Sequence, residues 1–316
     1  MSEGFEHRPV MLAEVVELLG QVPPGLVVDA TVGGGGHTRA LLDALPRHRF
    51  LGLDRDEEAL AAARVTLSGF EDRVVLRRAR FDRLKAMVEE AAANEPVAAV
   101  LFDLGVSSPQ VDRPERGFSY SHDAPLDMRM DRTQETTAAD VVNTAPVERL
   151  TQVLYDYGDE RFAQRIARAI VDARPLHSTA ELVDVIRQAI PAPARRRGGH
   201  PAKRTFQALR IEVNDELAVL GPALDQALEL LTPSGRCVVL AYHSGEDRIV
   251  KDRFRAAATG GCVCPPGLPC VCGARPTVRL LKRGVRRPTA AEVADNPRAE
   301  SARLRAVEKL AGGDAA

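Results

Sequence analysis

The stretch LVVDATVGGGGH, residues 26–37, decides the fold class of this chain. It begins with a short apolar run that ends in Asp29, and four consecutive glycines, Gly33 to Gly36, follow before a helical pattern starts. A strand, a glycine-rich turn and a helix in that order are typical of α/β proteins that bind a nucleotide at the carboxyl end of a parallel sheet. Asp54 ends the next apolar run, 21 residues after Gly33, where a carboxylate can accept hydrogen bonds from both hydroxyls of a ribose.

The same alternation continues along the first hundred residues. Apolar runs separated by segments whose apolar residues recur three and four apart predict βαβ units and a parallel sheet. Strands are expected over residues 26–31, 50–54, 74–77 and 97–104, and helices over residues 37–45, 57–67 and 82–93. The expected fold class is therefore α/β, with a doubly wound, Rossmann-like core.

The alternation of strand and helix patterns ends after the fourth strand. From Ser107 to about Arg210 no strand pattern is seen, and helical periodicity is found instead over residues 147–154, 161–173 and 179–189. The later elements expected are a helix over 214–231, a strand over 236–242, a helix over 246–258, a hairpin around 282–284 and a C-terminal helix ending near Leu310. These patterns predict a core of residues 1–110 and 213–316, and an inserted helical domain of residues 111–212.

Composition and charge narrow the class of protein. The chain has 316 residues, of which 45% are hydrophobic and 28% charged, and it lacks both a secretory signal pattern and an apolar stretch of the roughly 20 residues that cross a bilayer. A cytoplasmic protein without membrane spans is expected. The net charge is only −1, yet residues 161–212 hold eleven basic and four acidic side chains. This segregation indicates either a cationic surface for a polyanion such as a nucleic acid or solvated helix faces.

The glycine loop also limits the choice of nucleotide. Thr38 occupies the third glycine position of the G-x-G-x-x-G pattern, which disfavours a dinucleotide, and no G-K-[ST] follows, which excludes a P-loop. S-adenosylmethionine carries adenosine without phosphate and suits a glycine loop followed by a ribose-binding acid. A second motif, DLGVSSPQ at residues 103–110, follows the fourth strand and would face the reacting end of the cofactor, unless Asp103 only caps a turn.

These motifs and five others resemble those of one bacterial family. The others are ERGFS at 115–119, PLDMRMD at 125–131, HPAKRTFQALR at 200–210, IEVNDEL at 211–217 and HSGEDRIVK at 243–251. Together they closely resemble the ribosomal RNA small subunit methyltransferase H family, also called MraW, over nearly the whole chain. The resemblance implies a class I methyltransferase core with a helical insert, which methylates N4 of a cytidine in the decoding region of 16S rRNA, in the small ribosomal subunit, from S-adenosylmethionine.

The resemblance also implies roles for individual residues. The cofactor-binding residues of the family correspond to Gly35, Gly36, His37, Asp54, Phe81, Asp103 and Gln110. One departure is visible, because the family's usual H-S-L-E-D-R reads with Gly245 at its third position. A glycine there removes a packing side chain at the start of a helix.

The chemistry of the expected reaction points to a proton acceptor. The exocyclic amine of cytosine is a poor nucleophile, because its lone pair is delocalised into the ring, so an enzyme must hold its N–H groups and align the nitrogen with the methyl group. Asp103, or a carbonyl of its loop, is the candidate acceptor. Asp127 and His243 are secondary catalytic candidates, and a buried or capping role for each is equally open.

The RNA-binding prediction depends on a basic cluster in the insert. Arg195, Arg196, Arg197, Lys203 and Arg204 flank two glycines and could follow phosphates, and Phe118 or Tyr120 could stack on a base that leaves its stack. The alternative to an enzyme is a non-catalytic RNA-binding ribosome-assembly factor with a vestigial nucleotide fold. The sequence leaves open whether the chain acts as a monomer or a homodimer.

The last motif is a cluster of cysteines. Cys262, Cys264, Cys270 and Cys272 form a C-x-C-x5-C-x-C pattern among glycines and prolines. Four thiolates could hold a structural zinc ion, or the thiols could simply be reduced at the surface, and the spacing decides neither. The fifth cysteine, Cys237, lies in an expected strand and is predicted to belong to the core.

Overall fold

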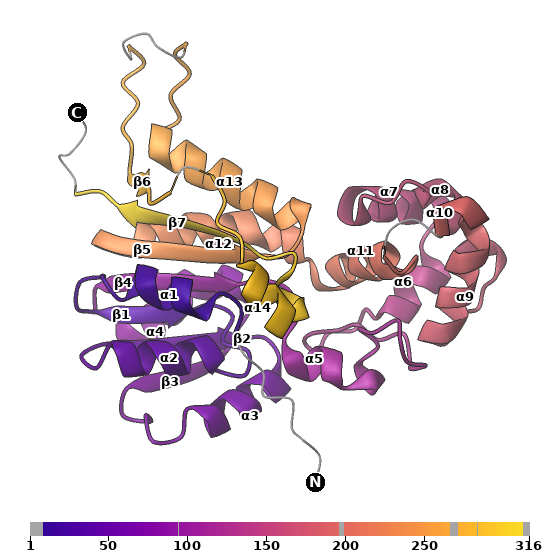
Figure 1. Ribbon diagram of the computed structural model, residues 1–316, viewed down its shortest axis with the longest axis horizontal. Coiled ribbons are helices and arrows are strands. Elements are labelled where there is room, and N and C mark those ends of the chain that lie inside the picture. Colours follow the sequence, from indigo (N-terminus) through magenta and orange to yellow (C-terminus); the bar gives the residue numbers. More distant parts are fainter. Residues whose placement is uncertain (1–8, 94, 196–198, 266–270, 283, 312–316) are drawn as a thin grey trace. The chain divides into compact units, whose positions relative to one another are not determined.

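The chain folds into two compact units. The computed structural model describes residues 9–93, 95–195, 199–265, 271–282 and 284–311 (Figure 1). One unit consists of Met1–Gly105 and Leu217–Ala316 and is called the α/β unit; the other, Val106–Glu216, is called the helical unit. Within the described residues no helix is both long enough and apolar enough to cross a membrane.

The α/β unit is built from alternating strands and helices. Its strands are β1 (Leu26–Asp29), β2 (Arg49–Asp54), β3 (Val74–Arg78), β4 (Val97–Asp103), β5 (Leu231–Ala241), β6 (Val278–Leu280) and β7 (Arg303–Lys309). Its helices are α1 (Leu12–Leu19), α2 (Gly36–Ala44), α3 (Glu57–Thr66), α4 (Leu84–Ala92), α12 (Glu216–Leu230), α13 (Ser244–Thr259) and α14 (Ala290–Asp295), with the short 3-10 turns η1 (Phe81–Arg83) and η3 (Pro297–Ala299). Every strand predicted in the first hundred residues is confirmed to within two residues at either end.

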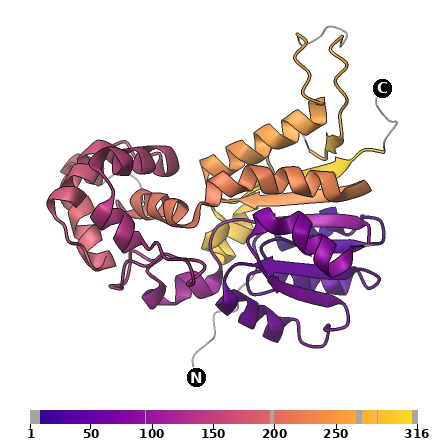
Figure 2. The ribbon, with the colours of Figure 1, turned by 180° about the vertical axis from the view of Figure 1, so that it is seen from behind.

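One seven-stranded sheet forms the centre of this unit. The strand order is β3-β2-β1-β4-β5-β7-β6, in which β7 is antiparallel to both of its neighbours. Helices cover both faces (Figures 1 and 2). Buried residues of α1, α2 and α3 pack on one face, and buried residues of α4, α12 and α13 pack on the other. All four residues of β1 are buried, because helices cover both faces of this central strand. A strand in that position must be apolar almost throughout.

The C-terminal segment corrects a sequence prediction. The helix expected to end near Leu310 is wrong: residues 303–309 form strand β7, which pairs with β5 and β6. Leu304 and Ala306 pack on one face of the sheet and Val307 packs on the other, as expected for a strand. The alternation of apolar and polar residues is difficult to recognise in so short a segment with several charged side chains. The hairpin expected around residues 282–284 is also wrong. Strand β6, which precedes this turn, pairs with β7, and α14 and η3 lie between the two strands in the sequence. Residue 283 itself lies outside the described residues.

The helical unit has its own hydrophobic core. Its elements are α5 (Ser108–Asp112), η2 (Pro114–Arg116), α6 (Ala138–Thr144), α7 (Val147–Gly158), α8 (Ala163–Asp172), α9 (Thr179–Ala189), α10 (Ala192–Arg195) and α11 (Lys203–Asn214). Leu150, Ile166, Ile170, Leu182 and Leu209 are fully buried in one cluster. Asn214 ties the long segment before α6 to α11, since its Nδ2 donates to the Met128 carbonyl at 2.7 Å and its Oδ1 accepts from the Met130 amide at 2.8 Å.

The boundaries of the two units depend on tertiary contacts. Sequence patterning placed the insert at residues 111–212, whereas the helical unit covers Val106–Glu216. A boundary after residue 212 would cut α11, which continues to Asn214. Asp215 then adopts a left-handed conformation with φ of 53° and separates α11 from α12, so the helix expected over residues 214–231 begins only after this break.

Candidate active site

Three neighbouring parallel strands of the α/β unit each end in an aspartate. These are Asp54 on β2, Asp29 on β1 and Asp103 on β4, and β1 pairs with both of the other strands. Because the carboxyl ends of parallel strands share one edge, the three carboxylates belong to the same edge of the sheet. From β1 the chain first adds β2 and β3 on one side of the sheet and then returns to add β4 on the other side. Doubly wound folds bind their ligands at this switch point, between β1 and β4.

The glycine loop between β1 and α2 bends back onto the end of β2. The amide of Gly33 donates to Oδ2 of Asp54 at 3.0 Å, a contact between two motifs 21 residues apart. Gly33 and Gly35 have φ of 52° and 85°, which favour glycine. A Cβ at Gly36 would lie 2.6 Å from Cγ of Pro9, whereas a Cβ at Gly34 would meet nothing within 4 Å. The loop is therefore packed at one end and open at Gly34.

Asp54 combines a fixed orientation with unused acceptor capacity. Its Oδ1 accepts from the Asp56 amide at 2.9 Å, and its Oδ2 accepts from Gly33. A carboxylate offers about four lone-pair sites, so both oxygens can accept again. Burial raises the pKa of Asp54 to about 6, so the group is mostly ionised at neutral pH. This arrangement suits a ligand with two adjacent hydroxyls.

Asp29 has a structural role at the same edge. It is buried, and its Oδ2 accepts from the Thr38 hydroxyl at 2.7 Å while its Oδ1 accepts from the Thr31 amide at 3.2 Å. Burial raises the pKa of Asp29 above its ordinary value. The Thr38 hydroxyl thus anchors the first turn of α2 to β1, at the position where a dinucleotide site would carry glycine.

Asp103 is contacted on both of its carboxylate oxygens. The Tyr242 hydroxyl donates to Oδ1 at 2.6 Å, and Nδ1 of His37 lies 3.4 Å from Oδ2. The other ring nitrogen of His37 lies 3.0 Å from the Val10 carbonyl, and the side chain is 6% exposed. The Asp103 amide donates to the Thr31 hydroxyl at 2.6 Å. The carboxylate is therefore oriented by His37 of α2 and by Tyr242, while Thr31 holds the backbone of Asp103.

Tyr242 is the member of this site that sequence reasoning missed. It follows β5, the parallel neighbour of β4, and its ring approaches Gly105, where a Cβ would lie 3.3 Å from Cδ2 of the tyrosine. Burial, together with the adjacent Asp103 charge, raises the pKa of Tyr242 well above its ordinary value, so the phenol remains a donor. Its position at the end of an expected strand, as for Asp54 and Asp103, was the signal available in the sequence.

His243, a secondary catalytic candidate, caps helix α13. Its Nδ1 accepts from the amides of Gly245 and Glu246 at 3.2 and 3.4 Å. Its Nε2 lies 3.2 Å from Oε1 of Glu246, but not in hydrogen-bonding geometry. A Cβ at Gly245 would lie 3.0 Å from Cδ1 of Leu217, so the glycine allows close packing here. The capping interpretation of His243 accounts for these contacts.

Phe81 begins η1, two residues beyond the end of β3, and packs edge to face against Phe102 with ring centroids 5.9 Å apart. Gln110 and Asp127 belong to the helical unit. Oε1 of Gln110 accepts from the Ser107 amide at 3.0 Å and completes the N-terminal cap of α5.

Asp127 forms a bidentate pair with Arg129. The Nε and Nη2 atoms of Arg129 donate to its two oxygens at 2.7 and 2.9 Å. Burial raises the pKa of Asp127, but the hydrogen bonds and charge of Arg129 outweigh this and hold it below the ordinary value. The carboxylate is thus kept ionised by a partner within its own unit.

The basic residues proposed for RNA contact have different surroundings. Arg195 and Lys203 are exposed, and Nη1 of Arg204 donates to the Asp159 carbonyl at 2.7 Å. Arg196 and Arg197 lie outside the described residues. Tyr120 stacks on His200 with centroids 4.4 Å apart, so one face of its ring is already covered, and the guanidinium of Arg116 lies 5.8 Å from the Phe118 ring centre.

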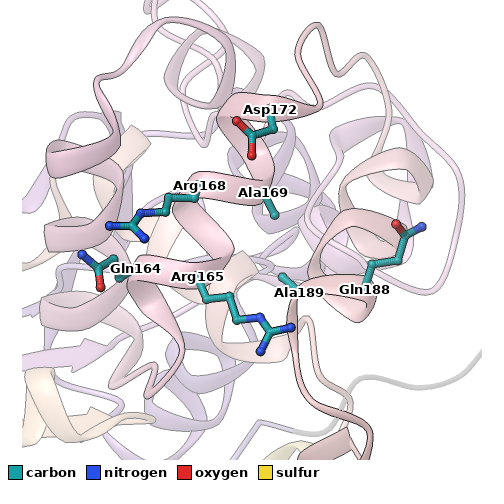
Figure 3. Close-up of a pocket in the computed structure, with 7 residues that line it drawn as sticks. All are labelled: Gln164, Arg165, Arg168, Ala169, Asp172, Gln188 and Ala189. Atoms are coloured by element: carbon teal, nitrogen blue, oxygen red, sulfur yellow. The ribbon is translucent and has the colours of Figure 1, made fainter.

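A pocket in the helical unit adds two arginines that sequence reasoning did not single out. Its volume is about 510 Å³. It is lined by Gln164, Arg165, Arg168, Ala169, Asp172, Gln188 and Ala189 (Figure 3). Arg165 and Arg168 both extend from α8 and are exposed. They belong to the basic stretch of residues 161–212.

The strand order, the antiparallel β7 and the strand-end site define a class I methyltransferase fold. The chain belongs to the MraW methylase family, whose sequence profile matches residues 4–310.

Several relatives are similar over nearly their whole length. The ribosomal RNA small subunit methyltransferase H of Heliobacterium modesticaldum is 52% identical, with 97% of this chain and 99% of that protein covered. The proteins of the same name from Thermobifida fusca and Acidothermus cellulolyticus are 55% and 56% identical, covering 98% and 96% of this chain and 94% of each relative. Among solved structures, a putative rRNA methylase from Clostridium thermocellum aligns with a TM-score of 0.45 and 15% identity, over 96% of this chain and 100% of that one.

Proposed function

We propose that this protein transfers a methyl group from S-adenosylmethionine to N4 of a cytidine in the decoding region of 16S rRNA. The observation that carries the proposal is the strand-end site, in which Asp54 holds the glycine loop and Asp103 is oriented by Tyr242 and His37. Membership of a methylase family, and relatives named ribosomal RNA small subunit methyltransferase H, support the same reaction. The intact acids and loop argue against a non-catalytic assembly factor.

The residues of the site fit the cofactor. The open space at Gly34 and the unused lone pairs of Asp54 suit a nucleoside with a free ribose diol, and no phosphate-binding loop is needed. We assign ribose binding to Asp54, contact with the loop to Gly35, Gly36 and His37, and adenine packing to Phe81. Asp103 and Gln110 complete the proposed set. When bound, S-adenosylmethionine supplies a methyl group activated by a positively charged sulfur.

Asp103 receives the central chemical role in the proposal. It accepts a hydrogen bond from the cytosine amine, which localises the nitrogen lone pair, and it takes the proton that the nitrogen loses as the N–C bond forms and the S–C bond breaks. Tyr242 remains protonated and keeps the carboxylate oriented. Alignment of the cytosine amine with the methyl group can supply up to ~7–11 kcal/mol of the barrier.

The helical unit receives the RNA-recognition role. Its exposed Arg165, Arg168, Arg195 and Lys203 provide positive charge for phosphates, which position a nucleic acid without reading its sequence. Arg204, and the undescribed Arg196 and Arg197, belong to the same proposed surface. The expected partner is 16S rRNA within the small ribosomal subunit, and the expected location is the cytoplasm.

The experiment that tests the proposal is methyl transfer to small ribosomal subunits that lack the modification. S-adenosylmethionine with an isotopically labelled methyl group is added with the protein, and the rRNA is digested to nucleosides for mass spectrometry. Labelled N4-methylcytidine is expected. Label at C5 of cytosine or on another base would contradict the assigned chemistry, and subunit binding without any transfer would favour the assembly factor.

A further inference from the structure

We propose that Cys262, Cys264 and Cys272 bind a zinc ion that stabilises the segment between α13 and β6, called the cysteine excursion and comprising residues 260–275. This proposal does not depend on the proposed methyl transfer. It starts from the course of the chain, in which the segment leaves the end of α13 and returns to the sheet (Figure 1).

The two ends of the excursion meet at its base. Gly260 ends α13 with φ of 62°, and a Cβ there would lie 2.4 Å from the backbone carbon of Arg275. The Thr277 amide donates to the Ala257 carbonyl at 3.0 Å. Cys262 and Cys264 therefore lie on the outgoing arm of a closed loop, and Cys272 lies on its returning arm.

The sulfurs of the two arms converge. The Sγ atoms of Cys262, Cys264 and Cys272 all lie within 4.8 Å of one another, and those of Cys262 and Cys272 are 3.6 Å apart. A tetrahedral zinc ion with Zn–S bonds of about 2.3 Å separates its sulfur ligands by about 3.8 Å, whereas a disulfide requires about 2.05 Å. The spacing of the sulfurs matches shared ligation of one ion.

The described residues of the excursion make little apolar packing. Val263 and Val271, beside the cysteines, are 86% and 88% exposed. None of the described residues between 261 and 274 belongs to a buried hydrophobic cluster. Short segments without a core commonly depend on a metal or another cross-link, because ion binding provides the free energy that burial does not.

The surroundings of one sulfur also suit a bound thiolate. The Val271 amide, on the returning arm, donates to Sγ of Cys264 at 3.4 Å. Backbone donors of this kind orient metal ligands and stabilise their negative charge. Thiolates select zinc over magnesium or calcium. The described cysteines provide three of the four positions of a tetrahedral ion; Cys270, the remaining cysteine of the motif, lies outside the described residues.

The test measures metal binding by the full chain. Protein purified under reducing conditions and freed of metal is titrated with Co²⁺ and then Zn²⁺, with native mass spectrometry as a second readout. One equivalent of Co²⁺ with intense thiolate-to-metal absorption, displaced by one equivalent of Zn²⁺, is expected. Cys262→Ser and Cys272→Ser should each weaken binding at least about 10-fold, since even outer ligand partners have effects of that size.

Cys237→Ala is the matched control. Cys237 is fully buried in β5, and burial raises the pKa of its thiol, so removing it should leave the metal stoichiometry at one. Zinc should also protect the excursion from proteolysis, and the protection should vanish in Cys272→Ser. The proposal is overturned if the reduced chain takes up no metal, if the cysteines are recovered as a disulfide, or if both cluster variants bind zinc as tightly as the unchanged protein.

Discussion

The two units hold their candidate functional residues in different ways. In the α/β unit, Asp54 and Asp103 sit at strand ends, and each carboxylate is oriented by contacts on both of its oxygens. In the helical unit, Arg165 and Arg168 extend from one exposed helix face around a pocket. Covalent chemistry requires groups fixed within a fraction of an ångström, whereas phosphate contacts tolerate mobile charges. The difference predicts that changes in the first unit affect the reaction and changes in the second affect RNA affinity.

The largest effect is expected for Asp103→Ala. Loss of the proposed acceptor should lower methyl transfer by about 10²–10⁴-fold, the usual contribution of general acid–base catalysis, while RNA affinity and the unfolding temperature stay near those of the unchanged protein. Single-turnover transfer to small subunits measures the rate. Asp43→Ala, an exposed change on α2, is the control. Unchanged turnover in the Asp103 variant would remove the acid from the mechanism.

Asp54→Asn should weaken the binding of the cofactor, which precedes methyl transfer. The amide keeps one acceptor oxygen but loses the charge, and hydrogen bonds to charged groups contribute about 1.5–3 kcal/mol, so the Kd for S-adenosylmethionine should rise about 10–100-fold. Calorimetry measures the affinity, again beside Asp43→Asn. RNA affinity should not change. An unaltered cofactor Kd would show that the ribose is not held by this carboxylate.

The pH dependence of cofactor binding also tests whether the Asp54 carboxylate holds the ribose. The pKa of Asp54 is raised to about 6 by burial, and protonation removes the charge of the carboxylate and turns one acceptor position into an O–H donor. Affinity should therefore be full above pH 7 and fall about tenfold for each unit below the pKa. Calorimetry from pH 5 to pH 8 gives the profile. The Asp54→Asn protein should lack this transition; if it keeps the transition, another group is responsible.

The smallest effects are expected in the helical unit. Arg165→Gln and Arg168→Gln should each weaken binding to small subunits several-fold and reduce the slope of log K against log salt by about 1, with cofactor affinity unchanged. Filter binding at several salt concentrations measures the slope. Arg149→Gln is the matched control, because Arg149 already pairs with Glu212 at 2.7 Å. A slope unaltered in the α8 variants would exclude their contact with phosphate.

Local patterns predicted the first half of the α/β core well, because each strand from β1 to β4 contains a continuous apolar run and the helices between them have their own periodicity. The same reasoning found Gly33 and Asp54, whose spacing reflects one βαβ unit. It failed for residues 303–309, where the alternating pattern is short and pairing with β5 and β6 decides the conformation. It also failed for Tyr242, since nothing near Asp103 in the sequence indicates a partner 139 residues away.

The sequence by itself therefore determined the parallel core, the glycine loop, the acids at the strand ends and the core position of Cys237. Only the tertiary structure decided which groups orient Asp103, where α11 gives way to α12, that His243 caps a helix, and that the sulfurs of two chain segments converge. The physical reason is the sequence separation over which each kind of interaction acts. Periodicity and turn chemistry act over a few residues, whereas these contacts join segments brought together only when the sheet and its helices pack.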